Sequence, residues 1–102
     1  MGKNKEPESE FVLKLFVSGA SPNSVRAINN VKKVLTKYIK GKYSLSIIDI
    51  YQDKTVAESE QIIAVPMLIK KFPLPEKRLI GDMSDTKRVL KGLEITAEGT
   101  EE

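Results

Sequence analysis

The spacing of hydrophobic residues changes from segment to segment along the chain, and these changes predict its secondary structure. Residues 11–17 form an almost unbroken apolar run, which is typical of a central strand buried on both faces. Apolar residues then recur every three or four positions over residues 22–40, a stripe that predicts a helix. Residues 43–51 begin with alternation and are rich in strand-forming residues, so they predict a second strand. Because one helix connects these strands, we expect them to be parallel, with a right-handed crossover.

Short polar residues mark the ends of the first two helices. Ser21 is a good N-cap for the first helix, and Gly41 fits the position that closes it. Thr55 and Glu58 have the spacing of a capping box, which predicts a short second helix up to about residue 63.

The second half of the chain predicts a hairpin followed by a helix. Residues 66–72 and 77–81 are apolar runs on either side of a proline-rich turn. Pro66 has no backbone donor, so it suits only the start of its strand. We expect Ser84 to cap the last helix and Gly92 to stop it. The predicted order is β-α-β-α-β-β-α, a single α/β domain.

Composition limits both the domain organisation and the chemistry. The 102 residues suffice for one hydrophobic core, which we place in residues 11–94, with disordered tails at residues 1–10 and 95–102. The absence of Cys and His excludes disulfides, thiolate metal sites and the commonest general base. The acidic residues are scattered or lie in the tails, so no carboxylate cluster replaces these groups. We therefore expect no enzyme activity and no cofactor.

The distribution of apolar residues also bears on localisation. No apolar run approaches the roughly 18 residues that a membrane-spanning helix needs. Residues 1–6 lack the apolar stretch of a signal peptide. We expect a cytoplasmic protein that does not bind membranes.

Charge is unevenly spread along the chain. Residues 11–94 hold 15 of the 17 basic residues but only 8 of the 14 acidic ones, which gives this segment a net charge of +7. A basic body suits an acidic protein or a nucleic acid. Four cations lie on the predicted hairpin, where they either dock onto an acidic surface or protect a sheet edge from aggregation: Lys70, Lys71, Lys77 and Arg78. Phe72 is the single aromatic residue near them, so the pattern gives little support to nucleic-acid binding.

The predicted order of elements and two short motifs resemble thioredoxins. Residues 20–23 (ASPN) stand at the strand-to-helix turn where a redox thioredoxin carries Cys-x-x-Cys. Residues 64–67 (AVPM) resemble the segment that holds the thioredoxin cis-proline, although the sequence leaves the isomer of the Val65–Pro66 bond open. A lone serine without a base is not a nucleophile. The resemblance therefore implies a thioredoxin-like scaffold that binds a partner rather than a catalyst.

Several short motifs occur in order along the chain, namely residues 13–19 (LKLFVSG), 21–27 (SPNSVRA), 48–49 (ID), 64–66 (AVP), 73–75 (PLP) and 79–85 (LIGDMSD). Together, over about residues 11–94, these motifs resemble the KaiB family of circadian clock proteins. The family implies a non-catalytic adaptor that binds the ATPase ring of KaiC in a thioredoxin-like form and helps to sequester KaiA. Sensor domains of clock-output histidine kinases share part of the pattern. The family also has an alternative, tetramer-type βαββααβ fold, and two such folds coexist only if they differ by a few kcal/mol.

The chain departs from the family pattern at three places. Gln61 stands where the family usually carries Lys at the KaiC interface, and Ser46 replaces Lys on the edge associated with KaiA. Residues 92–98 are less apolar than the family's usual run, which must serve as a strand in the alternative fold. We therefore expect a thioredoxin-like monomer, with homo-oligomers belonging to the alternative fold. The departures favour a divergent paralogue, with stress or output signalling outside the core clock as an alternative function.

The resemblance implies two sets of functional positions. The residues implied to contact a partner are Gln61, Lys70, Lys77, Arg78 and Asp82. The residues implied in fold switching or structure are Pro66, Pro73, Pro75, Gly92 and Glu94.

Overall fold

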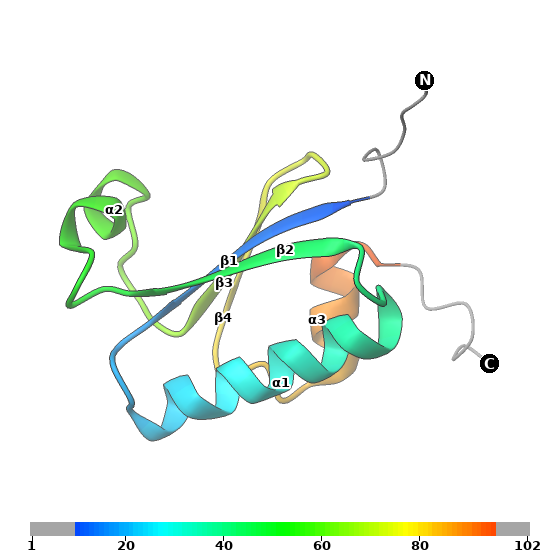
Figure 1. The fold of residues 1–102 in the computed structure, drawn as a ribbon, viewed down its shortest axis with the longest axis horizontal. Coiled ribbons are helices and arrows are strands. Elements are labelled where there is room, and N and C mark those ends of the chain that lie inside the picture. Colours follow the sequence, from blue (N-terminus) through cyan, green and yellow to red (C-terminus); the bar gives the residue numbers. More distant parts are fainter. Residues whose placement is uncertain (1–9, 96–102) are drawn as a thin grey trace.

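The computed structural model describes residues 10–95, and its centre is a four-stranded mixed sheet in the order β2-β1-β3-β4 (Figure 1). The strands are β1 (Phe11–Val17), β2 (Tyr43–Asp49), β3 (Met67–Phe72) and β4 (Lys77–Ile80). β1 and β2 are parallel, whereas β3 is antiparallel to both β1 and β4. The predicted β-α-β unit and the predicted hairpin are therefore confirmed. β2 ends at Asp49, two residues earlier than the sequence predicts.

The three helices cover the sheet unequally. They are α1 (Pro22–Tyr38), α2 (Lys54–Ser59) and α3 (Thr86–Leu93), which gives the predicted order β-α-β-α-β-β-α. Leu15 of β1 belongs to a core that α1 and α3 cover, whereas the next residue, Phe16, packs in a second core with Val56 of α2. Successive strand residues point to opposite faces of a sheet. This alternation explains why the β1 run is apolar at nearly every position.

The first helix begins as predicted and ends earlier. The Ser21 hydroxyl accepts a hydrogen bond from the backbone N–H of Ser24, at 3.3 Å, which confirms the N-cap. The helix ends at Tyr38 rather than residue 40. Gly41, the residue predicted to close the helix, is left-handed with φ of 88°, and Lys40 before it is already left-handed with φ of 55°. The Lys40 N–H donates to the Leu35 carbonyl at 3.0 Å.

The predicted capping box of the second helix is wrong. α2 begins at Lys54, and Asp53 occupies the N-cap position without a side-chain cap hydrogen bond. A tight turn follows β2, in which the Asp53 N–H donates to the Asp49 carbonyl at 2.9 Å. The chain enters the helix directly from this turn, so Thr55 lies inside the first helical turn. The helix also ends at Ser59, well before residue 63.

Both predicted ends of the last helix are also wrong. The N-cap is Asp85, whose carboxylate accepts the backbone N–H three residues later, rather than Ser84. Gly92 does not stop the helix, because the left-handed C-cap with φ of 60° falls on Glu94. A Cβ at Gly92 would lie 2.4 Å from the Leu79 Cδ2 atom. The glycine therefore lets α3 approach β4 closely instead of ending the helix.

The ends of the chain are described only in part. Ile95, which the sequence assigns to the C-terminal tail, packs against the core shared by α1 and α3. Its N–H donates to the Leu90 carbonyl at 2.9 Å. The remaining tail residues, 1–9 and 96–102, lie outside the described residues. In the described part of the chain, no helix is long and apolar enough to cross a membrane.

Candidate protein-binding surface

The turn between β1 and α1 is closed by hydrogen bonds among three serines. The Ser21 and Ser24 hydroxyls are 2.8 Å apart, and the Ser18 and Ser21 hydroxyls are 3.1 Å apart. The buried Ser24 hydroxyl also accepts the Ser18 N–H at 3.0 Å. The chain has no His that could activate one of these hydroxyls. The three hydroxyls therefore form hydrogen bonds with one another and with the backbone, and these hydrogen bonds stabilise the turn.

Exposed apolar residues precede and follow α2 in the sequence. Gln61 follows the helix in a left-handed conformation, with φ of 58°, and its side chain is exposed. Ile63 is 91% exposed, and Tyr51, which precedes α2, is 65% exposed. Large exposed apolar groups are typical of protein contact sites. The exposure of Ile63 could not be predicted from the sequence, because the predicted second helix extended over Ile62 and Ile63 and ends at Ser59 in the structure.

The three X–Pro bonds implied in the resemblance have the same isomer. The Val65–Pro66, Phe72–Pro73 and Leu74–Pro75 bonds are all cis. Pro66 directly precedes β3, as its missing donor predicts. Pro73 and Pro75 lie in the turn between β3 and β4, where Leu74 is 75% exposed.

The four hairpin cations do not form one patch. Lys70 lies directly opposite Lys77 in the β3–β4 register, and Arg78 lies opposite Ile69. Because adjacent residues of a strand point to opposite faces, Lys70 and Lys77 face α3, whereas Lys71 and Arg78 face the α2 side. The structure thus divides the predicted basic cluster between two faces of the sheet.

On the α2 side, Glu60 gathers cations from three strands. Its carboxylate lies 3.1 Å from Lys14 Nζ, 3.1 Å from Lys71 Nζ and 3.7 Å from Arg78 Nη2. Glu76 adds contacts of 3.3 Å to Lys71 and to Arg78. The hydrogen bond from Lys71 lowers the pKa of Glu60, and burial opposes this shift only in part. The same hydrogen bond raises the pKa of Lys71. The cluster fixes the end of α2 to the sheet, next to Gln61.

On the α3 side, Glu94 holds the other two hairpin cations. Lys70 Nζ lies 3.3 Å from one carboxylate oxygen, and Lys77 Nζ lies 3.7 Å from the other. The Lys70 side chain is only 1% exposed, whereas Glu94 is 48% exposed. In this arrangement Lys70 does not present its ammonium group to a partner. It instead ties β3 to the C-cap of α3.

Asp82 lies on the α1 side, apart from Gln61 on the α2 side. Its carboxylate accepts hydrogen bonds from the Ser84 N–H, at 3.1 Å, and from Arg26 Nε, at 3.3 Å. Asn30 donates to its backbone carbonyl at 2.8 Å. Hydrogen bonds from the Ser84 side chain and backbone lower the pKa of Asp82, with Arg26 contributing less. Asp82 therefore anchors the loop before α3 to α1.

These features define a thioredoxin-like domain, and solved structures confirm the fold. The N-terminal domain of Synechococcus elongatus SasA matches with a TM-score of 0.70 at 21% identity, over 90% of each chain. Thioredoxin from Fasciola hepatica matches with a TM-score of 0.68 at 11% identity, over 86% of this chain and 82% of that one. Within residues 10–95, no three potential metal-ligating side chains gather closely enough to hold an ion.

Sequence relatives identify the family. The KaiB domain model matches residues 14–95. The circadian clock oscillator protein KaiB of Synechococcus elongatus is 44% identical over 89 residues, 87% of each chain. Its counterpart from Picosynechococcus is 46% identical over 88 residues, 86% of this chain and 85% of the relative. The chain belongs to the KaiB family, and these relatives are named as clock proteins rather than enzymes.

Proposed function

We propose that this chain is a non-catalytic clock or signalling adaptor that binds the ATPase ring of a KaiC-type protein in its thioredoxin-like form. Membership of the KaiB family supports a clock-related role, and the carrying observation for the site is the fully exposed Ile63 beside Gln61. When a partner covers an isoleucine that is almost wholly exposed, apolar surface is removed from water, and this contributes favourably to the free energy of binding. We place this adaptor in the cytoplasm, with KaiA or a clock-output histidine kinase as further partners.

The proposed interface has an apolar centre and a charged border. Ile63 and Tyr51 supply the apolar groups, because aromatic and large aliphatic anchors carry most of the binding energy of an interface. Gln61 comes two residues before Ile63, and Arg78 shares the Glu60 cluster that immediately precedes Gln61. Arg78 stays one-third exposed in that cluster, so it remains able to meet an acidic partner.

The remaining family-derived positions have supporting or separate roles in this proposal. Lys77 is 42% exposed and contributes charge on the α3 side, while the buried Lys70 supports that side from within. Asp82 contributes through the loop that it anchors to α1. Pro66, Pro73, Pro75, Gly92 and Glu94 remain the proposed positions at which the thioredoxin-like and alternative folds differ.

Binding to a KaiC-type ring tests the proposal directly. Affinity is measured by biolayer interferometry with the ring in its ADP and ATP states. We expect Ile63→Glu to weaken binding at least about tenfold, because it places a charge at the centre of the interface. The matched control is Leu74→Glu, since Leu74 is also an exposed apolar residue but lies in the hairpin turn. Absence of binding in both nucleotide states, or equal losses for the two variants, would contradict the proposal.

Nucleic-acid binding remains the alternative function, and internal ion pairs weaken its support. Six of the basic residues that give the body its charge are paired with carboxylates, namely Lys14, Arg26, Lys70, Lys71, Lys77 and Arg78. A nucleic-acid-binding protein loses affinity steeply as salt rises. A titration with single-stranded RNA at two salt concentrations separates this alternative from the adaptor role.

A further inference from the structure

A groove of about 530 Å³ lies between α1 and the beginning of α3. Its apolar surface comes from Val34, Tyr38, Met83 and Leu90, three of which are buried or nearly so. Three exposed lysines also line it, and no carboxylate does: Lys33, Lys37 and Lys87. The lining does not include Tyr51, Gln61, Ile63, Lys77 or Arg78, the exposed residues of the proposed protein interface.

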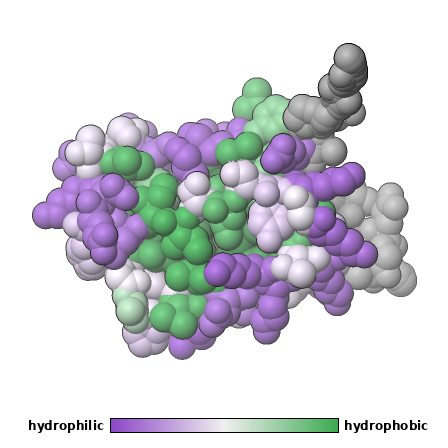
Figure 2. Space-filling model, viewed as in Figure 1, coloured by the Kyte–Doolittle hydropathy of each residue, from purple (hydrophilic) through white to green (hydrophobic). Residues whose placement is uncertain are grey.

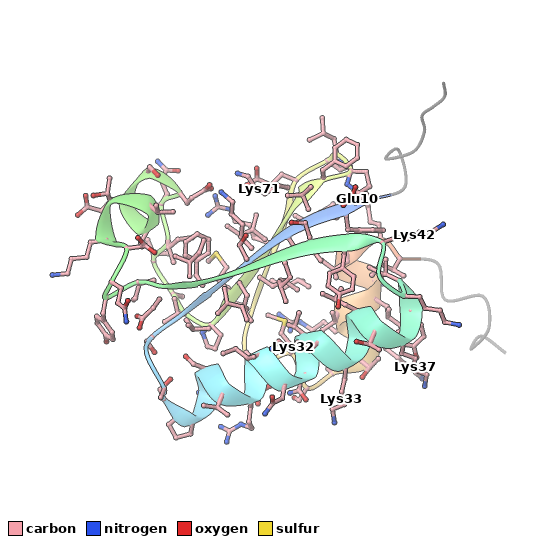
Figure 3. The ribbon with its side chains drawn as sticks, in the orientation of Figure 1. Glu10, Lys32, Lys33, Lys37, Lys42 and Lys71 are labelled. Carbon is pink, nitrogen blue, oxygen red and sulfur yellow. The ribbon has the colours of Figure 1, made fainter. Side chains whose placement is uncertain are left out.

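The lysines of this groove do not form ion pairs with acidic residues of the described part of the chain. Among residues 10–95, no carboxylate lies within 4.0 Å of Lys33, Lys37 or Lys87, although Asp85 is close in sequence and caps α3. Lys33 and Lys37 are four residues apart, so they lie on one face of α1. Figure 3 shows these two along the lower side of α1, with Lys32 on its upper side. Lys37 Nζ also lies 5.3 Å from the centre of the Tyr38 ring.

We propose that this groove binds an organic diphosphate of the nucleoside diphosphate class. Three cations line one groove, and a diphosphate carries about three negative charges in a single compact group near neutral pH. Lysine is a common partner of phosphate groups. The volume falls within the roughly 300–1,000 Å³ of small-molecule sites.

The rest of the lining favours an organic diphosphate over a free anion or an acidic peptide. Tyr38, Met83 and Leu90 offer an apolar surface on which a nucleoside can lie. Asn30, Ser84 and Thr86 add neutral hydrogen-bonding groups beside the lysines. A peptide would need three separate carboxylates within this small volume, where they would repel one another.

The test is an NMR titration of the ¹⁵N-labelled protein with magnesium-free ADP at low ionic strength. We expect shift changes centred on Lys33, Lys37, Tyr38 and Lys87, and an affinity that falls as salt rises. ADP should bind more tightly than AMP and than pyrophosphate, because the latter two lack one phosphate or the apolar body. Adenosine should produce no comparable shifts. Equal responses to adenosine and ADP, or tighter binding of hexaglutamate, would overturn the proposal.

Single substitutions separate this groove from general positive charge. Lys33→Gln, Lys37→Gln and Lys87→Gln should each weaken ADP binding by about fivefold, since each removes one charged contact. The matched control is Lys32→Gln, because Lys32 is an exposed neighbour on α1 that does not line the groove. It should change the affinity by less than about twofold. Equal losses at Lys32 and Lys33 would overturn the site, whatever the result with the KaiC-type ring.

Discussion

The hairpin and the α1–α3 groove carry similar numbers of cations, but only the hairpin cations are paired with carboxylates in the part of the chain that the structure describes. Each hairpin cation, such as Lys71 or Arg78, lies within 4.0 Å of a carboxylate from another part of the chain. The groove lysines, such as Lys33, have no such partner in the part of the chain that the structure describes. The positive charge that is available to a ligand therefore lies in the groove. It does not lie in the hairpin, where basic residues are dense in the sequence.

The position of the acidic residues explains the difference. Residues 11–48 contain seven basic residues and no acidic one, so α1 has no local carboxylate. The hairpin is surrounded by Glu60 after α2, Glu76 in its turn and Glu94 at the end of α3. Glu60 and Glu94 connect elements that are distant in sequence, whereas Glu76 pairs with cations of its own hairpin. The hairpin cations consequently contribute to the fold, whereas the groove lysines remain available for binding.

The largest effect in this comparison is expected from Glu60→Gln. The substitution leaves Lys14, Lys71 and Arg78 without their shared anion, in a site where Glu60 is only 15% exposed. We expect the free energy of unfolding in urea to fall by about 2.5 kcal/mol, less than for a fully buried pair because water reaches the cations. Glu58→Gln is the control, since Glu58 is exposed and has no ion pair within residues 10–95. Equal effects of the two substitutions would contradict the structural role of Glu60.

The difference in stability between wild type and Glu60→Gln should depend on pH. The pKa of Glu60 lies below its ordinary value of 4.5, so its stabilising effect is complete above that pH and is lost as pH falls through the folded-state pKa. The stability difference between wild type and Glu60→Gln should therefore be constant above about pH 5.5 and shrink in more acidic solution. Urea unfolding at a series of pH values measures it. A difference that grows on acidification would show that another group dominates.

A smaller effect is expected at the α3 end of the hairpin. Glu94→Gln removes the anion that faces the buried Lys70, and we expect a loss of about 1.5 kcal/mol in unfolding free energy. Lys70→Met keeps most of the length of the side chain without its charge, so it should change stability by less than about 1 kcal/mol. Adding Glu94→Gln to Lys70→Met should then cost little more. If the two losses simply add, the pair is not coupled.

The smallest effect, of opposite sign, is expected in the groove. Lys33 and Lys37 are like charges four residues apart on α1, an arrangement that destabilises a helix slightly. Lys33→Gln should therefore raise the unfolding free energy by about 0.3 kcal/mol. Thermal unfolding followed by circular dichroism, compared with urea unfolding, resolves a change of this sign. A clear loss of stability would assign Lys33 to the fold and remove the contrast with the hairpin.

The sequence predicted the order of elements because local patterns determine it. The apolar run of β1, the stripe of α1 and the proline-rich hairpin turn each act within a few residues. Five helix ends were misplaced, namely the C-terminal end of α1 and both ends of α2 and α3, because the local pattern does not contain all the contacts that set them. Gly92 is the clearest case, since a glycine near a helix end usually stops the helix, whereas here it makes room for Leu79.

The candidate sites were less predictable than the fold. The family resemblance gave Gln61, but the exposure of Ile63 depends on where α2 ends. Nothing in the local sequence of Lys70 indicates that it is buried, because its partner Glu94 comes 24 residues later. The groove joins α1 to the beginning of α3, so Lys87 comes about fifty residues after the two lysines of α1. Residues that are this far apart in the sequence can be recognised as neighbours only in the folded structure.

The outer position of β2 has a consequence for the handling of the protein. Tyr43–Asp49 contains no lysine and no proline, and Ser44, Ser46 and Ile47 are exposed on this last strand of the sheet. Figure 2 shows hydrophobic surface where β2 crosses the middle of the view. Natural edge strands usually carry charges or prolines that prevent pairing between molecules. We therefore expect colloidal stability at high concentration to depend on this strand, and Ser46→Lys to reduce association in concentrated samples.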